Sequence, residues 1–133
     1  MLTKRHFTTL QGLSDLLSVA TYGNGWPAIK AFKSDAEKGL FNQCECCEDK
    51  WATALLKGKG VVVYDCYELD EAETDEERAA ARHEITLADV KRGLDLMKEK
   101  YPRHWADLVE ENDDLITGDV WLQLTVFGEL IYG

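Results

Sequence analysis

Metal binding is the first chemistry that the residue types of this chain suggest. Its 133 residues include four cysteines and three histidines, and thiolates and imidazoles are the ligands that zinc prefers. The relevant residues are Cys44, Cys46, Cys47, Cys66, His83 and His104. Structural zinc sites usually pair two CxxC-like elements, whereas here a CxCC run is followed by a single cysteine. We therefore expect reduced thiols and no cofactor; whether the cysteines bind a metal, and what residues 34–50 do, stays open.

Catalytic chemistry has no recognisable motif in this chain. A nucleophile needs a base and an orienting group, and the sequence contains neither a GxSxG run nor a flanked catalytic cysteine. The histidines, His6, His83 and His104, are most simply surface or turn residues. Paired carboxylates can act as acid and base, but a run such as 70–77 is more typical of a solvated loop or an exposed helix. The sequence favours a protein that is not an enzyme.

The carboxylates are concentrated in two blocks of the sequence. Residues 65–77 carry eight acidic side chains and residues 104–133 carry seven, with no lysine or arginine in either block. The remaining segments, 1–64 and 78–103, are mildly basic, so the two blocks account for the net charge of −10. Acidic patches attract basic surfaces and accelerate encounters with them. The pattern therefore predicts a positively charged protein partner rather than nucleic acid or an anionic membrane.

Two groups of acidic residues are the predicted contacts with this partner. The first follows the main predicted strand and consists of Asp70, Glu71, Glu73, Asp75, Glu76 and Glu77. The second, which we expect to serve partly in helix capping and solubility, consists of Glu110, Glu111, Asp113 and Asp114. Salt limits the reach of exposed charges to about 8 Å at physiological ionic strength, so we expect association to weaken as salt is added.

Direct binding of nucleic acid is not expected, because affinity for phosphate comes largely from clustered lysine and arginine side chains. The nearest approach to such a cluster lies on the polar side of one predicted helix and consists of Lys91, Arg92, Lys98, Lys100 and Arg103. The acidic composition fits mimicry of nucleic acid better than binding of it. In mimicry, carboxylates take the place of phosphates in a basic nucleic-acid-binding groove on another protein. Because the acids gather in two blocks, such mimicry would be partial.

Length and composition favour a single domain spanning residues 1–133. A chain of this length buries roughly two thirds of its unfolded surface without disulfides or metals, and a hydrophobic content of 45% argues against disorder. The N-terminus lacks an apolar run of signal-peptide length, and no stretch approaches the roughly 18 apolar residues of a membrane helix. We expect a cytoplasmic protein without a membrane partner, of undetermined oligomeric state.

Periodicity predicts an α+β fold in which three or more helices pack on a small, mainly antiparallel sheet. Apolar residues at helical spacing predict helices over 8–21, 48–57, 86–101 and 103–112. β-branched and alternating residues predict strands over 26–33 and 61–69, with 83–85 pairing back as a long-looped hairpin. At the start of the helix over 86–101, Thr86 is the expected N-cap, and Asp89 is the carboxylate near the free amides.

The segment 119–132 is ambiguous between helix and strand. Alternating apolar residues suit a strand, whereas Thr117 and Asp119 form a helix-start signal and the length of the segment favours a helix. We predict a largely buried helix in which Gly128 permits close packing.

Five short runs occur in order through residues 85–133: TLADV, YPRH, ENDD, TGDV and FGELIYG. In combination they resemble the C-terminal part of small uncharacterised proteins encoded by phages and prophages. The N-terminal half, including the cysteine cluster, departs from that pattern, and no site residue transfers. The resemblance implies a setting, because accessory phage genes often encode small proteins that inhibit host machinery, including restriction and CRISPR defence systems.

These observations support one functional hypothesis and two alternatives. We expect a small acidic accessory protein that binds and inhibits a basic surface of a host protein, one that handles nucleic acid. The first alternative is a metal-dependent regulator or enzyme built on the cysteines. The second is a self-assembling structural protein that uses exposed aromatic residues such as Trp26, Trp51 and Trp105.

Overall fold

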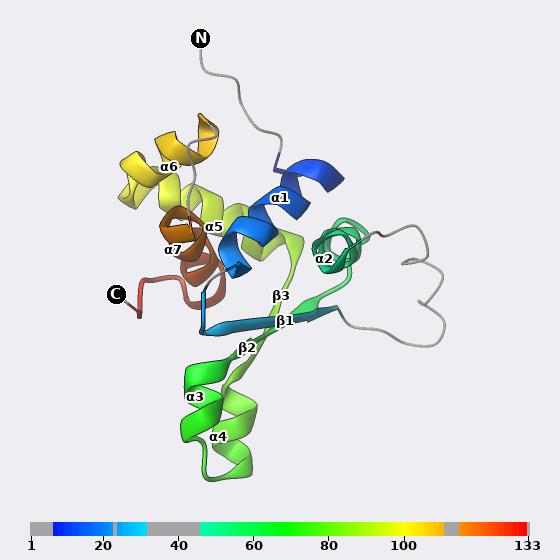
Figure 1. Cartoon of the computed structure of the whole chain (residues 1–133), viewed down its shortest axis with the longest axis vertical. Coiled ribbons are helices and arrows are strands. Elements are labelled where there is room, and N and C mark those ends of the chain that lie inside the picture. The colour runs from blue at the N-terminus through cyan, green and yellow to red at the C-terminus, as the bar shows by residue number, and fades with distance from the viewer. Residues whose placement is uncertain (1–6, 23, 32–45, 111–114, 133) are drawn as a thin grey trace.

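The computed structural model describes residues 7–22, 24–31, 46–110 and 115–132. Within these ranges the chain forms helices and a small sheet, which is the expected α+β class (Figure 1). In chain order the elements are α1 (Leu10–Thr21), β1 (Pro27–Ala31), α2 (Cys47–Leu56), β2 (Val61–Asp65), α3 (Cys66–Glu71), α4 (Asp75–Ala80), β3 (Arg82–Ile85), α5 (Leu87–Lys100), α6 (Pro102–Val109) and α7 (Leu115–Phe127).

The three strands form an antiparallel sheet in the order β1-β2-β3, with β2 in the centre. Ile29 of β1 lies opposite Val63 of β2, which lies opposite His83 of β3. The pairing predicted for residues 83–85 is therefore confirmed. All helices except α3 and α4 gather on one side of the sheet (Figure 1), and β2 is buried beneath them except at Tyr64.

Helix α7 is the centre of the helical layer. It packs against both α5 and α1, and eight of its 13 residues are buried. A helix that is apolar on all sides is stable only when it is surrounded by other elements. Trp121 is fully buried, and its indole Nε1 donates to the carbonyl oxygen of Val90 in α5 at 3.4 Å. The prediction of a largely buried helix is confirmed.

Both ends of α7 differ from the prediction. The helix begins at Leu115, so Thr117 lies buried within its first turn and does not act as the N-cap. Gly128 is not a packing position, because nothing lies within 4 Å of the place where its Cβ would be. Its φ of +76° is in the left-handed region, which glycine enters at little cost because it has no Cβ. Gly128 therefore ends α7.

The predicted strand over 61–69 is wrong beyond Asp65. β2 ends at Asp65, and α3 begins at the next residue. One carboxylate oxygen of Asp65 accepts hydrogen bonds from the backbone N–H groups of Tyr67 and Glu68, at 3.1 and 3.3 Å. These bonds satisfy free amides of the first helical turn. Capping by Asp65 thus outweighs the alternation of residues 64–69.

The other predicted helices are confirmed as α1, α2, α5 and α6, with small shifts at their ends. At the start of α5, Asp89 Oδ2 accepts from the backbone N–H of Thr86 at 2.8 Å, as expected for a capping box. Helix α6 begins at Pro102, which suits the first helical position because that position needs no N–H donor. The predicted end of this helix, residue 112, lies outside the described residues. Among the described helices none is long and apolar enough to cross a membrane.

Helices α1 and α7 approach each other closely at Gly118. A Cβ at this position would lie 2.6 Å from the backbone carbon and oxygen of Val19. Real Cβ atoms essentially never come so close to backbone, which cannot move aside as a flexible side chain does. The absence of a side chain at Gly118 therefore allows the central helix to be buried against α1.

We expect Gly118→Ala to lower the free energy of unfolding by about 1–3 kcal/mol, the usual cost of overpacking. This is opposite in sign to helix propensity, which favours alanine over glycine by about 1 kcal/mol. Urea unfolding followed by circular dichroism measures the change. Lys91→Ala, at an exposed position in α5, should shift stability by no more than about 0.5 kcal/mol. A Gly118→Ala protein as stable as the wild type would contradict the close approach.

Candidate functional site: an acidic helical arm

Helices α3 and α4 form a hairpin that projects from the sheet, away from the other helices (Figure 1). They lie between β2 and β3 in the chain, and they pack on each other and on the strands that they join. Neither helix contains a buried residue. We call residues 66–80 the arm. An element of this kind contributes little to the core, so its composition is free to serve another purpose.

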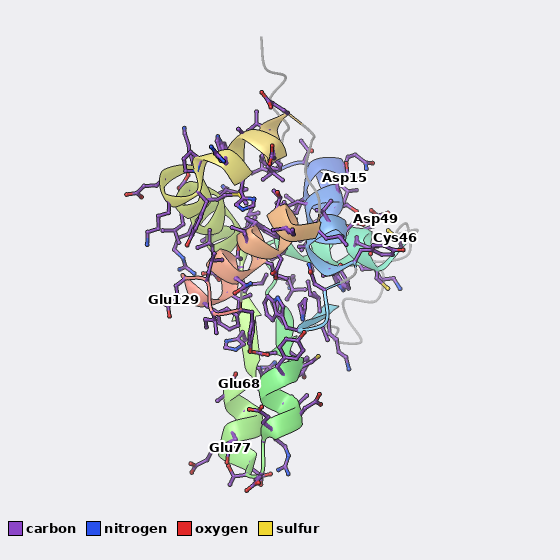
Figure 2. The ribbon with its side chains drawn as sticks, turned by 60° about the vertical axis from the view of Figure 1, so that its left-hand side comes forward. Asp15, Cys46, Asp49, Glu68, Glu77 and Glu129 are labelled. Carbon is purple, nitrogen blue, oxygen red and sulfur yellow. The ribbon has the colours of Figure 1, made fainter. Side chains whose placement is uncertain are left out.

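The arm carries most of the first acidic block. Seven carboxylates face a single arginine, which gives the arm a net charge of −6. All of the carboxylates are exposed; they are Glu68, Asp70, Glu71, Glu73, Asp75, Glu76 and Glu77. Figure 2 shows Glu68 nearer the sheet and Glu77 nearer the tip. The structure thus brings the whole first group of predicted contacts together on one exposed element.

Local interactions explain why so acidic a segment is helical. Thr74 caps α4 by accepting a hydrogen bond from the backbone N–H of Glu77 at 3.1 Å. Three acids, Asp75, Glu76 and Glu77, occupy the first turn of α4, where the positive end of the helix dipole favours negative charge. Arg78 Nη1 lies 2.7 Å from Asp75 Oδ1 in an exposed ion pair. The acids of α4 therefore help to form the helix that displays them.

The second predicted group is not part of this arm. Glu110 follows the last residue of α6 and is exposed, and α6 lies at the opposite end of the molecule from the arm in both views (Figures 1 and 2). Glu111, Asp113 and Asp114 lie outside the described residues. Glu110 and the arm therefore do not share one surface.

The base of the arm is held by Asp65, whose role the sequence reasoning missed. The residue is only 2% exposed. Its Oδ1 caps α3, and its Oδ2 accepts a hydrogen bond from the hydroxyl of Tyr132, 67 residues away in the chain, at 2.5 Å. The backbone N–H of Cys66 donates to the carbonyl oxygen of Trp26 at 2.7 Å. The capping of α3 could have been predicted from the sequence, because Asp65 and Glu68 have the spacing of a helix N-cap pair. The contact with Tyr132 could not.

Aromatic rings surround this junction. Tyr132 lies edge-on to Tyr67, with ring centres 5.2 Å apart, and Trp26 lies 5.8 Å from Tyr132 and 5.2 Å from Phe127. Trp26 is 2% exposed. Its expected exposure, on which the self-assembly alternative partly depended, is therefore wrong, and Trp51 and Trp105 are only partly exposed. The rings cover Asp65 and fix the arm to the body of the protein.

The two described histidines lie in a strand and a helix rather than in turns, and both are only partly exposed. His83 lies in β3, half-buried, with its ring edge-on to Phe127 at 5.2 Å. Its Nε2 is buried without a hydrogen-bond partner and lies 3.9 Å from Glu68 Oε2, which is too far for a hydrogen bond. His104 lies in α6, with its Nδ1 3.1 Å from Thr117 Oγ1. His6 lies outside the described residues. Packing between elements, which local sequence does not encode, partly buries both histidines.

The described cysteines stand at the starts of two helices. Cys46 and Cys47 are exposed at the start of α2, and Cys66 begins α3; Cys44 is outside the described ranges. Burial, followed by the charges of Asp70 and Asp65, raises the pKa of the Cys66 thiol. This favours the protonated thiol, which is a weak nucleophile. No three histidine, cysteine or acidic side chains of the described residues gather in a group that could hold a metal ion.

The chain matches no protein-family model, no curated protein and no solved structure. The arm is the described element that combines exposure, projection and dense charge of one sign. Dense exposed charge of one sign acts on partners of the opposite sign at a distance, before any contact forms. The charge of the arm would therefore attract a partner of basic surface before contact.

The hydrogen bond between Tyr132 and Asp65 gives the fold a dependence on alkaline pH. Burial raises the pKa of Tyr132, and the hydrogen bond to Asp65 and the charges of Asp65, Glu68 and Glu71 raise it further. The folded state thus holds the phenol proton more tightly than the unfolded state. The resulting stabilisation is complete below the ordinary tyrosine pKa of about 10 and is lost as the pH rises above it.

We expect Tyr132→Phe to lower the free energy of unfolding at neutral pH by about 1.5–3 kcal/mol, the usual contribution of a hydrogen bond to a charged group. Between about pH 9 and pH 11 the wild type should lose stability more steeply than the variant. Urea unfolding at a series of pH values measures both effects. Tyr22→Phe is the control, because Tyr22 is 77% exposed, and it should keep the wild-type slope. Equal slopes for the wild type and Tyr132→Phe would contradict the assignment.

Proposed function

We propose that this protein binds and blocks a basic surface of a nucleic-acid-handling host protein, and that the arm makes the first contact. The observation that carries the proposal is the exposure of the seven carboxylates on an element without buried residues. Within the described part of the chain, Asp75 is the only one of them in an ion pair with a lysine or arginine. Glu68 lies 3.9 Å from His83 Nε2, and the other five are exposed to cations of a partner.

The charge density of the arm supports partial mimicry of nucleic acid. Each of its two helices has six residues, which at 1.5 Å per residue corresponds to a length of about 9 Å. The two helices together carry a net charge of −5, because Glu73 lies in the turn between them. Over that length this is one charge per about 1.8 Å, close to the one per about 1.7 Å of duplex DNA. At about 3.4 Å per base pair, however, the arm imitates fewer than three pairs. An arm of this length is better suited to block the entrance of a nucleic-acid-binding groove than to fill the whole groove.

The proposed biological setting comes from the resemblance of residues 85–133 to phage and prophage proteins. Phage accessory proteins that act on host defences work in the host cytoplasm. Restriction and CRISPR components bind nucleic acid through basic grooves, and such grooves are the surfaces that an acidic arm fits. We therefore propose a component of such a defence system as the target.

An affinity pull-down from host lysate at low and high salt tests whether the arm is the contact. We expect the triple variant Glu71→Lys, Glu73→Lys and Glu76→Lys to weaken partner binding about tenfold or more at low salt, because attraction becomes repulsion. These positions leave Thr74, Asp75 and Arg78 in place, so α4 keeps its cap and its ion pair.

The matched control for this experiment changes the net charge equally at exposed acids off the arm: Asp95→Lys, Glu99→Lys and Glu129→Lys. We expect this control to retain most of the binding. Circular dichroism of both triple variants checks that they are folded. Equal retention of the partner by both variants, or equal loss, would show that the arm has no special role.

Competition by nucleic acid tests the mimicry separately. If the arm occupies a nucleic-acid-binding groove, excess duplex DNA or RNA should release the captured partner, because both compete for the same basic side chains. The fraction of partner eluted by nucleic acid is compared with that eluted by a sulfate solution of equal ionic strength. If nucleic acid releases no more partner than sulfate does, mimicry is contradicted. The partner would then bind the arm through a basic surface that does not bind nucleic acid.

A further inference from the structure

A cavity of about 550 Å³ lies between α7, α6 and the residues that follow Gly128, and no residue of the arm lines it. Its walls include Asn24, His104, Ile116 and Ile131. Small-molecule sites in proteins typically have volumes of about 300–1,000 Å³ and combine an apolar lining with a few placed polar groups. The size and mixed lining of this cavity fit that description.

The rim of the cavity is unusually apolar for an exposed surface. Ile116, in the first turn of α7, is 65% exposed, and Ile131, after the helix, is 52% exposed. Both are large aliphatic side chains that line the same cavity. Exposed apolar side chains that line a common cavity are typical of ligand-binding grooves. The apolar part of a ligand would lie between these two residues.

The polar group that sets the chemistry of the cavity is the carboxylate of Asp119. Its Oδ1 accepts from the indole Nε1 of Trp26 at 2.6 Å, and its Oδ2 accepts from Nε2 of Gln123 at 3.0 Å. Both donors are uncharged, and the ion pairs of the described residues do not include Asp119. A carboxylate has about four acceptor positions, so about two remain. The half-buried negative charge is therefore held in place without a cation to balance it.

Gln123 makes this arrangement rigid. The residue is 1% exposed, and its Oε1 accepts from the backbone N–H groups of Ile131 and Tyr132, both at 2.8 Å. Its Nε2 donates to Asp119 and to the carbonyl oxygen of Tyr132, at 3.0 and 3.2 Å. All four hydrogen-bonding positions of the amide are used. The wall and the carboxylate are thus positioned before a ligand arrives, which reduces the ordering cost of binding.

We propose that this cavity binds a small organic cation with an apolar body, an amine or guanidine whose charged head pairs with Asp119. The apolar body lies between Ile116 and Ile131. A neutral ligand gains the apolar contact without the charge pairing, and an anion is repelled by the carboxylate. The site does not depend on the function proposed for the arm.

The probes for this site are 2-phenylethylammonium and two analogues of similar shape, the neutral 2-phenylethanol and the anionic 3-phenylpropionate. Titration is followed by ¹H–¹⁵N NMR at the Trp26 indole N–H, which donates directly to Asp119. We expect a saturable shift of this signal with 2-phenylethylammonium, with a Kd of about 1 mM or tighter. The alcohol should bind at least about fivefold more weakly, and the carboxylate should not bind. Equal affinity for cation and alcohol, or no shift of the Trp26 signal by about 20 mM cation, overturns the proposal.

Substitutions locate the two contacts. Asp119→Asn should weaken the binding of 2-phenylethylammonium at least about fivefold and leave 2-phenylethanol unaffected. Ile116→Ala, at an exposed position that leaves the hydrogen bonds of Gln123 intact, should weaken both probes. Asp95→Asn, an exposed acid on α5, is the matched control and should change neither. Unchanged affinity for 2-phenylethylammonium in Asp119→Asn overturns the proposal. If that variant does not fold, the comparison of the three probes on the wild type tests the charge pairing instead.

Discussion

The carboxylate of Asp65 is the interaction on which the arrangement of this protein depends. Asp65 is the last residue of the central strand, and its carboxylate caps α3. The same carboxylate accepts a hydrogen bond from the hydroxyl of Tyr132, at the far end of the described chain. A buried carboxylate is costly unless hydrogen bonds compensate for the lost water. Here two backbone amides and one phenol supply them, so a single side chain joins the sheet, the arm and the C-terminal residues.

This junction explains how the arm can be both acidic and exposed. Six carboxylates on two short helices and a seventh in the turn between them repel one another, and neither helix has a buried side chain to offset the repulsion. Capping by Asp65 and Thr74 and the ion pair of Arg78 stabilise each helix locally. The strands at both ends of the arm are paired to each other. The body of the protein therefore holds the arm in place, and the arm is free to carry charge.

The same C-terminal residues connect the arm to the cavity. Tyr132 donates through its hydroxyl to Asp65 and through its backbone N–H to Gln123, and Gln123 donates to Asp119. Trp26 links both ends of this hydrogen-bond network. Its indole donates to Asp119, and its carbonyl oxygen accepts from the backbone N–H of Cys66, the first residue of α3. Both proposed binding surfaces are thus built on one hydrogen-bond network, although the ligands proposed for them differ: a basic protein for the arm and a small organic cation for the cavity.

The sequence by itself determined the α+β class, the main helices, the buried character of α7 and the exposure of the first acidic block, because periodicity, capping and charge are local properties. The end of β2 was predicted wrongly, because the alternation of residues 64–69 suits a strand although Asp65 caps a helix there. Gly128 was predicted wrongly as a packing position. Only the tertiary structure decided that the acids form a projecting arm and that Asp65 meets Tyr132. The cavity around Asp119 likewise draws its walls from segments far apart in the chain. Such contacts depend on how the elements pack, and no local pattern of residues encodes them.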